Sequence, residues 1–250
     1  MGEKIGLTAA DEHEFSVWRA GDGPGLVVIQ EIFGVNSHIR NVVDRFADKG
    51  FAAVAPALFD RIGPGHELGY EADDVAKGRD LRAQCGNEAA ILDVRAAVDL
   101  LVSEGRKVAV VGYCWGGSLA WKSACEIAGL ACSVGYYGGE ITKNADAVPL
   151  CPVMLHFGET DHAIPMEDVE TVKTNQPDVP IHVYPAGHGF SCDERGSYHA
   201  DSHELALERT LDFLRRHLAS GTRASRENLP RPQSCYSLHI PRDQYRVASI

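Results

Sequence analysis

The stretch VVGYCWGGS, residues 110–118, joins an apolar run to a cysteine that stands between glycines. The preceding KVAVVGY predicts a buried strand, and the following WGGSLAWKSACEIAG predicts an amphipathic helix. Gly112 and Gly116 carry no side chain where strand and helix approach each other closely. Cys114, between them, is therefore expected at a sharp and strained strand-to-helix turn that lifts its thiol above the sheet.

A thiol at such a turn faces the free N–H groups and the positive dipole end of the helix that follows. These surroundings favour ionisation of Cys114 more than a core position does, so we interpret it as a nucleophile. The pattern G-x-C-x-G by itself occurs by chance, and its place between strand and helix is what favours this reading over a buried structural cysteine. Cys125 and Cys132 lie within a predicted helix and a predicted strand and are expected to fill the core.

Short apolar runs alternate with longer amphipathic segments along the chain. The predicted strands cover residues 25–30, 52–58, 107–113, 132–138, 152–158 and 180–186. Their hydrophobicity is continuous, which is typical of strands covered on both faces in a parallel sheet. One intervening helix is predicted to have Asn87 as its N-cap and Gly105 as its stop. We therefore predict one α/β domain over residues 1–220, a mostly parallel twisted sheet with helices on both faces.

Composition narrows the function and the surroundings of the protein. The net charge of −11 argues against binding to nucleic acid or to an anionic membrane. The seven cysteines are scattered without a C-x-x-C pair, which favours reduced thiols in a cytoplasmic protein over disulfides or structural zinc. No secretory signal and no membrane-length apolar run is visible. Residues 221–250 contain three prolines and five arginines without periodicity, and we predict an irregular C-terminal extension there.

Two later strands end next to residues that a nucleophilic cysteine requires. Asp161 follows the strand at 152–158, and His188 follows the strand at 180–186. The ends of parallel strands share one edge of a sheet, so Cys114, Asp161 and His188 are expected to converge. Each residue alone has an ordinary explanation, since Asp161 also suits a helix cap and His188 a turn. Together they give the order nucleophile, acid, histidine, which is the order of the α/β-hydrolases.

Five motifs now identify a resemblance. The segments QEIFGVN (30–36), GYCWGG (112–117), VGYYGG (134–139), GETDHAIP (158–165) and AGHGF (186–190) resemble the dienelactone hydrolase family, the carboxymethylenebutenolidases, over roughly residues 5–218. The resemblance implies an α/β-hydrolase fold. It implies hydrolysis of a lactone or carboxylic ester through an acyl-thioester, with Cys114, His188 and Asp161 as the triad and no cofactor or metal.

The resemblance also assigns the groups around the nucleophile. It places Glu31 beside the thiol, where the carboxylate holds the resting cysteine protonated and helps to deprotonate it when substrate arrives. A nearby anion disfavours a thiolate, so this role is physically coherent. The oxyanion hole is expected from the backbone N–H groups of Ile32 and Trp115. Phe33 and Tyr137, from the same motifs, are candidates for substrate binding.

The expected substrate site departs from the family pattern. The family binds a substrate carboxylate with two arginines, one of them four residues after the triad histidine, where this chain has Cys192. The other belongs to the helical region that residues 73–84 replace. The candidates there and nearby are Lys77, Arg79, Arg82 and Arg195, with Arg79 as the substrate-binding prediction. Trp115 places an indole beside the nucleophile, where it is expected to narrow the pocket or to stack within it. We therefore expect an altered substrate specificity.

Two other classes of function stay open at this stage. A cysteine of the class I amidotransferase and DJ-1-like group, active in redox sensing or deglycation, also pairs a strand-end cysteine with a glutamate. A non-catalytic binding protein can also retain a hydrolase fold. Zinc hydrolysis is a more distant reading, because no H-E-x-x-H motif or comparable cluster appears. The expected partner is a small-molecule lactone or ester, and the expected assembly is a monomer or a small homo-oligomer.

Overall fold

A computed structural model describes residues 2–219 of the chain. The extension predicted at residues 221–250 lies outside the described residues, and the division near residue 220 stays a prediction. The strands are β1 (Glu3–Thr8), β2 (Glu14–Ala20), β3 (Gly25–Ile29), β4 (Ala52–Pro56), β5 (Val108–Tyr113), β6 (Cys132–Tyr136), β7 (Val153–Gly158) and β8 (Ile181–Tyr184). The helices are α1 (Ser37–Asp48), α2 (Ala72–Cys85), α3 (Asn87–Ser103), α4 (Trp115–Glu126), α5 (Met166–Asn175) and α6 (Ala200–Leu218), with short 3₁₀ turns at Leu58–Arg61 and Thr142–Asn144.

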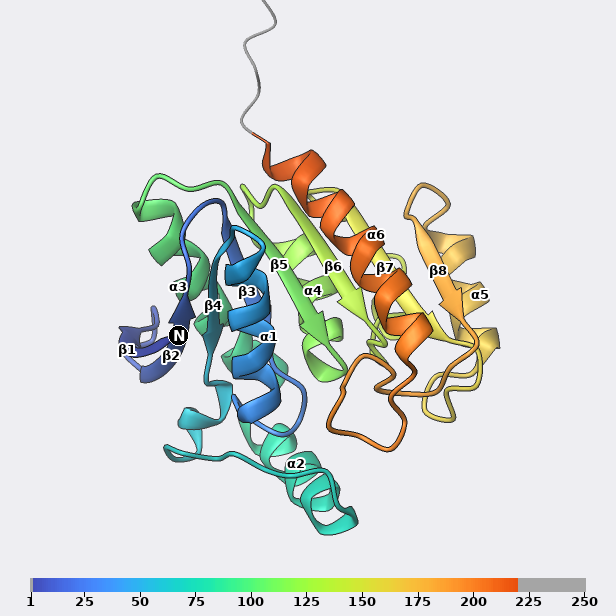
Figure 1. Cartoon of the computed structure of the whole chain (residues 1–250), viewed down its shortest axis with the longest axis horizontal. Coiled ribbons are helices and arrows are strands. Elements are labelled where there is room, and N and C mark those ends of the chain that lie inside the picture. The colour runs from blue at the N-terminus through green and yellow to red at the C-terminus, as the bar shows by residue number, and fades with distance from the viewer. Residues whose placement is uncertain (1, 220–250) are drawn as a thin grey trace, which may run out of the picture. The chain divides into compact units, whose positions relative to one another are not determined.

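The eight strands form one sheet in the order β1-β2-β4-β3-β5-β6-β7-β8 (Figure 1). Strands β3 to β8 pair in parallel, whereas β1 pairs antiparallel with β2, and β2 pairs antiparallel with β4. Helices α1 and α6 cover one face of the sheet, and α3 and α4 cover the other (Figure 1). The predicted mostly parallel sheet with helices on both faces is confirmed.

The central strands are buried on both faces, as their continuous apolar sequences predict. All residues of β3, β4, β5, β6 and β7 are buried. The N-terminal hairpin of β1 and β2 was not predicted. Exposed and half-buried residues dominate β1, so it has no hydrophobic run from which a strand is read.

One predicted helix cap is wrong. Asn87 is the first residue of α3, and Gly86 precedes it as the N-cap. The Asn87 side chain instead accepts a hydrogen bond from Trp115 Nε1 at 2.8 Å and donates one to Glu140 at 2.9 Å. Gly105 does follow the helix end, with a φ of 78° that suits glycine.

The order of the strands creates a crevice. The chain leaves β3 through α1 to reach β4 on one side, and later returns as β5 on the other side of β3. The loops after β3 and β5 therefore diverge, and ligands of open α/β sheets bind at such a switch point, beyond the carboxyl ends of the strands.

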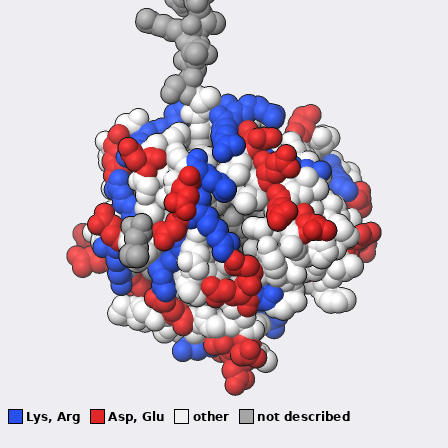
Figure 2. Space-filling view, viewed as in Figure 1, with Lys and Arg blue, Asp and Glu red and all other residues white. Residues whose placement is uncertain are grey.

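Charges of one sign do not cluster on the face of the molecule that Figure 2 shows. Figure 2 shows acidic and basic side chains intermingled over that face. Among residues 2–219, no helix is both long and apolar enough to cross a membrane.

Candidate active site

Cys114 lies at the turn between β5 and α4 in a conformation that side chains rarely adopt. Its φ is 57° and its ψ is −117°, a strained backbone geometry for a residue other than glycine. The flanking glycines are required by close backbone contacts. A Cβ at Gly112 would lie 1.9 Å from the carbonyl oxygen of Gly116, and a Cβ at Gly116 would lie 2.4 Å from that of Ile29. The sequence therefore folds locally so that the thiol projects beyond the end of the sheet.

A continuous line of hydrogen bonds runs from this thiol to a buried carboxylate. His188 Nε2 lies 3.1 Å from Cys114 Sγ, and His188 Nδ1 lies 2.8 Å from Asp161 Oδ2. The other oxygen of Asp161 accepts hydrogen bonds from the backbone N–H groups of Ala163 at 2.8 Å and Ile164 at 3.2 Å. Asp161 therefore does not cap α5, whose N-cap is Pro165. The three residues expected to converge from separate strand ends are brought together.

His188 is held in an environment that favours its protonated form. Burial by itself lowers the pKa of His188, but Cys114 in its thiolate form and the Asp161 carboxylate outweigh it and raise this pKa to about 10. The ring of Tyr137 packs against the imidazole, with 5.2 Å between the ring centroids. The arrangement suits a thiolate–imidazolium pair, which is a reactive form of a cysteine nucleophile.

The two expected oxyanion donors belong to two segments next to the thiol. Trp115 is the first residue of α4, and the first N–H groups of a helix have no partner within that helix. Ile32 lies in the loop after β3 and lines the same pocket as Cys114. Their positions are those at which the backbone donors of an oxyanion hole are found after a nucleophile turn.

A pocket of about 290 Å³ opens over Cys114 and His188. Phe33 and Arg79, two of the predicted substrate-binding residues, line it. Its charged lining consists of Arg79, Arg82, Glu140, Lys143 and Arg195. Arg82 and Lys143 lie 2.7 Å and 3.3 Å from Glu140, so both cations are paired with that carboxylate. Lys77 is outside the lining.

Two side chains expected at the pocket lie elsewhere. The indole of Trp115 is buried, stacks on Phe59 with 5.6 Å between the centroids, and donates its N–H to Asn87. It is absent from the pocket lining, so the prediction that it narrows the pocket or stacks within it is wrong. The side chain at the first position of α4 points into the core on the α3 side of the sheet. Tyr137 is fully buried behind His188 and is also absent from the lining.

Glu31 is a buried carboxylate at the end of β3, next to the strand that leads to Cys114. One of its oxygens lies 3.5 Å from Nη1 of Arg195. The guanidinium carbon of Arg195 lies 5.5 Å from the ring centroid of Phe33 and 5.9 Å from that of Tyr70. Arg195 was one of several candidates in the sequence, and its pairing with Glu31 was missed because 164 residues separate the two.

Cys192 occupies the position at which the family has an arginine, and it brings no charge. The side chain is fully buried, and burial, together with the negative charge of Glu31, raises the pKa of its thiol to about 12. The guanidinium in this part of the pocket is instead supplied by Arg195, three residues later.

Comparisons with known proteins agree with this geometry. The model of the dienelactone hydrolase family matches residues 16–218. Carboxymethylenebutenolidase of Pseudomonas sp. strain P51 is 36% identical over 214 residues, which cover 81% of this chain and 88% of that protein. Carboxymethylenebutenolidase of Pseudomonas putida is 35% identical over 232 residues, which cover 86% of this chain and 96% of that protein.

Solved structures show the same fold. The structure of a candidate dienelactone hydrolase from Klebsiella pneumoniae superposes with a TM-score of 0.73 at 26% identity, covering 84% of this chain and 98% of that one. The family match spans most of the chain, and it separates the protein from the amidotransferase and DJ-1-like group that the sequence left open. The chain belongs to the dienelactone hydrolase family.

Proposed function

We propose that the protein hydrolyses lactones or carboxylic esters with Cys114 as the nucleophile, His188 as the base and acid, and Asp161 as the group that orients His188. The observation that carries this proposal is the line from Cys114 Sγ through His188 to Asp161, with contacts of 3.1 Å and 2.8 Å, at the floor of the pocket. An orienting carboxylate, a base and a nucleophile in hydrogen-bond contact are the arrangement that activates a side chain for acyl transfer.

In the proposed reaction, the Cys114 sulfur attacks the carbonyl carbon, and the carbonyl π electrons move to the oxygen. The backbone N–H groups of Ile32 and Trp115 stabilise that oxyanion, and each such donor is worth about 3 kcal/mol in the transition state. Collapse breaks the bond to the alkoxy oxygen, which takes a proton from His188 and leaves an acyl-thioester on Cys114. Water then attacks the thioester and gives a proton to His188, the carbon–sulfur bond breaks, and the Cys114 sulfur takes that proton from His188. The carboxylic acid product leaves and loses its proton to solvent.

We propose that Glu31 restrains the thiol until substrate binds. An anion near a thiol disfavours the thiolate. Glu31 is buried just beyond β3, which pairs with the strand that leads to Cys114, and Arg195 pairs with only one of the two Glu31 oxygens. A substrate that draws Arg195 toward itself changes the balance of charge around Glu31 and the thiol. The role assigned to Glu31 therefore depends on Arg195 as its partner.

We propose a substrate that carries a carboxylate. Arg195 lines the pocket, and Arg79 lines it without a carboxylate partner among residues 2–219. A guanidinium binds a carboxylate through two parallel hydrogen bonds. The arginine that lines the pocket is at position 195, and Cys192 occupies the position of the family's arginine. We therefore expect the substrate carboxylate to be bound from a different direction than in the family. This difference supports a specificity that departs from that of the relatives.

The proposal is tested by assaying the purified protein against cis-dienelactone, trans-dienelactone and a neutral aryl ester. Cys114→Ala is expected to lower the rate on every substrate by about 10³-fold or more, while Cys125→Ala, which changes a thiol remote from the pocket, keeps the wild-type rate. Mass spectrometry of the quenched reaction is expected to find the acyl group on the peptide that contains Cys114. Unchanged hydrolysis by Cys114→Ala contradicts the proposed nucleophile. Hydrolysis of the aryl ester alone contradicts the proposed acidic substrate and leaves the mechanism in place.

A further inference from the structure

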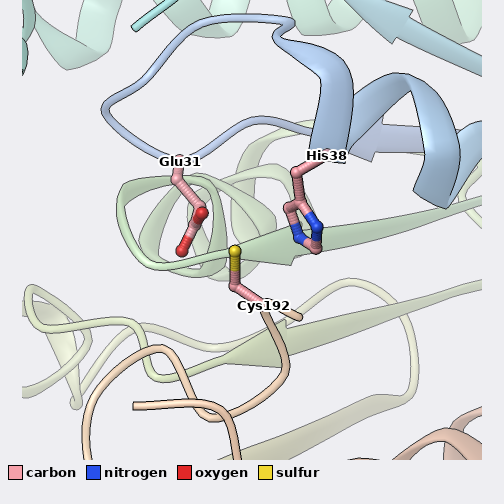
Figure 3. A group of neighbouring side chains, drawn as sticks. All are labelled: Glu31, His38 and Cys192. Carbon is pink, nitrogen blue, oxygen red and sulfur yellow. The ribbon is translucent and has the colours of Figure 1, made fainter. Parts of the chain in front are cut away.

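Beside the proposed active site lies a second cluster of reactive groups. Glu31, His38 and Cys192 are all buried, and one potential ligand atom from each lies within 4.8 Å of the other two. Figure 3 shows the three side chains pointing toward one another from separate segments, with the Cys192 sulfur between the Glu31 carboxylate and the His38 ring. No spacing in the sequence joins these residues, so the sequence predicted no metal site here.

Two of the three groups have a polar atom without a partner. Glu31 Oε2 and His38 Nε2 are buried and accept no hydrogen bond from residues 2–219. The side chains of Glu31 and His38 expose at most 1% of their surface. Native proteins leave few buried polar atoms unpaired, and a bound ion is one of the established explanations for such atoms.

His38 is oriented as metal-binding histidines are. Its Nδ1 lies 3.0 Å from Oδ1 of Asp193, and Asp193 in turn pairs with Arg45. A histidine that donates its Nδ1–H to a carboxylate carries a lone pair on Nε2, and this arrangement fixes the tautomer and raises ligand basicity. In that tautomer, the unpartnered Nε2 of His38 has a lone pair available to a metal ion.

The three groups are a thiol, an imidazole and a carboxylate, which are the ligand types of Zn²⁺. With tetrahedral angles and ordinary bond lengths, pairs of ligand atoms around Zn²⁺ lie about 3.3–3.7 Å apart. The ligand atoms of Glu31, His38 and Cys192, which lie within 4.8 Å of one another, reach such separations if the side chains move toward one another by about one ångström. We propose that Glu31, His38 and Cys192 form a binding site for Zn²⁺ or a similar divalent transition metal. On binding, the metal replaces the proton on the Cys192 sulfur, and that proton leaves to solvent.

Arg195 lies between this cluster and the pocket. It lines the pocket, and its guanidinium lies 3.5 Å from the Glu31 carboxylate. A metal ion enters past this side chain and competes with it for Glu31. The resemblance also gives Glu31 the role of helping to deprotonate Cys114 when substrate arrives, and a metal that holds the carboxylate removes this help, so the metal inhibits hydrolysis. This inhibition rests on the proposed function, whereas metal binding itself does not.

Metal binding is tested with Co²⁺ in a Cys114→Ala background, which removes the thiol that lines the neighbouring pocket. Chelator-stripped, reduced protein is titrated anaerobically with Co²⁺. We expect one equivalent to bind, with the near-ultraviolet charge-transfer absorption of a Co²⁺–thiolate bond and the intense visible bands of tetrahedral Co²⁺. Zn²⁺ is expected to displace the Co²⁺. Absence of the thiolate band in this background overturns the proposal.

Variants assign the ligands. Adding Cys192→Ser removes the thiolate band, His38→Gln weakens binding sharply, and Asp193→Asn weakens it by about 10–100-fold through the orientation of His38. Adding Cys125→Ala is the matched control and leaves the band unchanged. Circular dichroism verifies that each variant is folded. A band that persists in both Cys192→Ser and His38→Gln overturns the proposed site.

Inhibition of hydrolysis by the metal is measured separately. The rate of each variant with metal is compared with the rate of the same variant without metal. Micromolar Zn²⁺ is expected to inhibit the wild-type protein reversibly, and chelator is expected to restore the rate. Cys192→Ser is expected to resist inhibition. Equal inhibition of Cys192→Ser and wild type overturns the claim that metal bound at this cluster inhibits hydrolysis. A protein that binds Co²⁺ as expected but hydrolyses none of the three substrates contradicts the proposed function and leaves the metal site standing.

Discussion

Nη1 of Arg195 lies 3.5 Å from Oε1 of Glu31, so the guanidinium at the pocket wall is also the counter-ion of the buried carboxylate. The guanidinium carbon of Arg195 also lies over the rings of Phe33 and Tyr70, 5.5 Å and 5.9 Å from their centroids, which are distances typical of cation–π contacts. In the proposed function, the substrate carboxylate and Glu31 therefore compete for one cation. This competition links recognition of the substrate to the charge beside the nucleophile.

The first prediction concerns Arg195. Arg195→Ala is expected to lower kcat/KM for an acidic lactone by about 10–100-fold more than for a neutral aryl ester, since a charge-assisted hydrogen bond contributes roughly 1.5–3 kcal/mol. Arg195→Lys is expected to recover part of the loss, because an ammonium group keeps the charge but lacks the planar fork. Steady-state kinetics on both substrates check this. Equal losses on the acidic and the neutral substrate contradict a role in carboxylate recognition.

The second prediction concerns Glu31. Replacing it with glutamine removes a buried anion and leaves the Arg195 charge unbalanced, and both changes favour the Cys114 thiolate. Glu31→Gln is therefore expected to speed alkylation of Cys114 by iodoacetamide about tenfold without substrate, which corresponds to about 1.4 kcal/mol. Labelling rates at constant pH, read by mass spectrometry, measure it. Glu104→Gln is the control, since Glu104 also pairs with an arginine, Arg19, but does not line the pocket. Slower labelling of Glu31→Gln contradicts the restraining role.

The third prediction concerns pH. The folded-state pKa of His188, about 10, lies above its ordinary value of 6.5. The raised pKa of His188 contributes to the free energy of unfolding. This contribution is fully present below about pH 6.5 and is lost as pH rises through about 10. The free energy of unfolding is therefore expected to decrease over this window. In Cys114→Ala the decrease is smaller, because the sulfur is the largest influence that raises this pKa.

Denaturant unfolding at several pH values and NMR titration of the His188 ring protons measure both effects. Cys125→Ala, which alters a thiol outside the pocket, is the control and is expected to keep the wild-type His188 pKa. An unchanged His188 pKa in Cys114→Ala would show that the imidazole does not depend on the thiolate.

The parallel strands were predictable because each is a continuous apolar run between turn residues, and their observed ends lie close to the predicted ones. The hairpin of β1 and β2 was not predictable from hydrophobicity, because water covers much of β1. Cys114, Asp161 and His188 could be predicted to converge since each follows a parallel strand, and strand ends meet at one edge.

Other parts of the site depend on side-chain direction and on distant loops. Whether the Trp115 side chain points into the pocket or into the core depends on the angle at which α4 lies against the sheet. The sequence GYCWGG does not specify that angle. Arg195 pairs with Glu31, and His38 approaches Cys192. Both contacts bring together segments that are far apart in the sequence. No periodicity or short motif records such contacts.

The fourth prediction concerns the turn at Cys114. A methyl group at Gly116 would lie 2.4 Å and 2.5 Å from the carbonyl oxygens of Ile29 and Gln30, which are backbone atoms that cannot move alone. Gly116→Ala is therefore expected to destabilise the protein by about 2–4 kcal/mol and to shift the loop that carries Glu31. Thermal and denaturant unfolding measure it. Gly6→Ala is the control, because no atom lies within 4 Å of the added carbon. Equal stability of the two variants contradicts the close packing of the turn.

The fifth prediction separates Trp115 from the substrate. Its indole stacks on Phe59 and donates a 2.8 Å hydrogen bond to Asn87, away from the pocket. Trp115→Phe keeps the stacking but leaves the Asn87 oxygen without this donor, so we expect a loss of stability of about 1–3 kcal/mol. The ratio of kcat/KM between a bulky and a small aryl ester is expected to stay at the wild-type value. Phe33→Leu, at a residue that lines the pocket, is expected to change that ratio. A shift of ester preference in Trp115→Phe as large as that in Phe33→Leu would place the indole at the substrate after all.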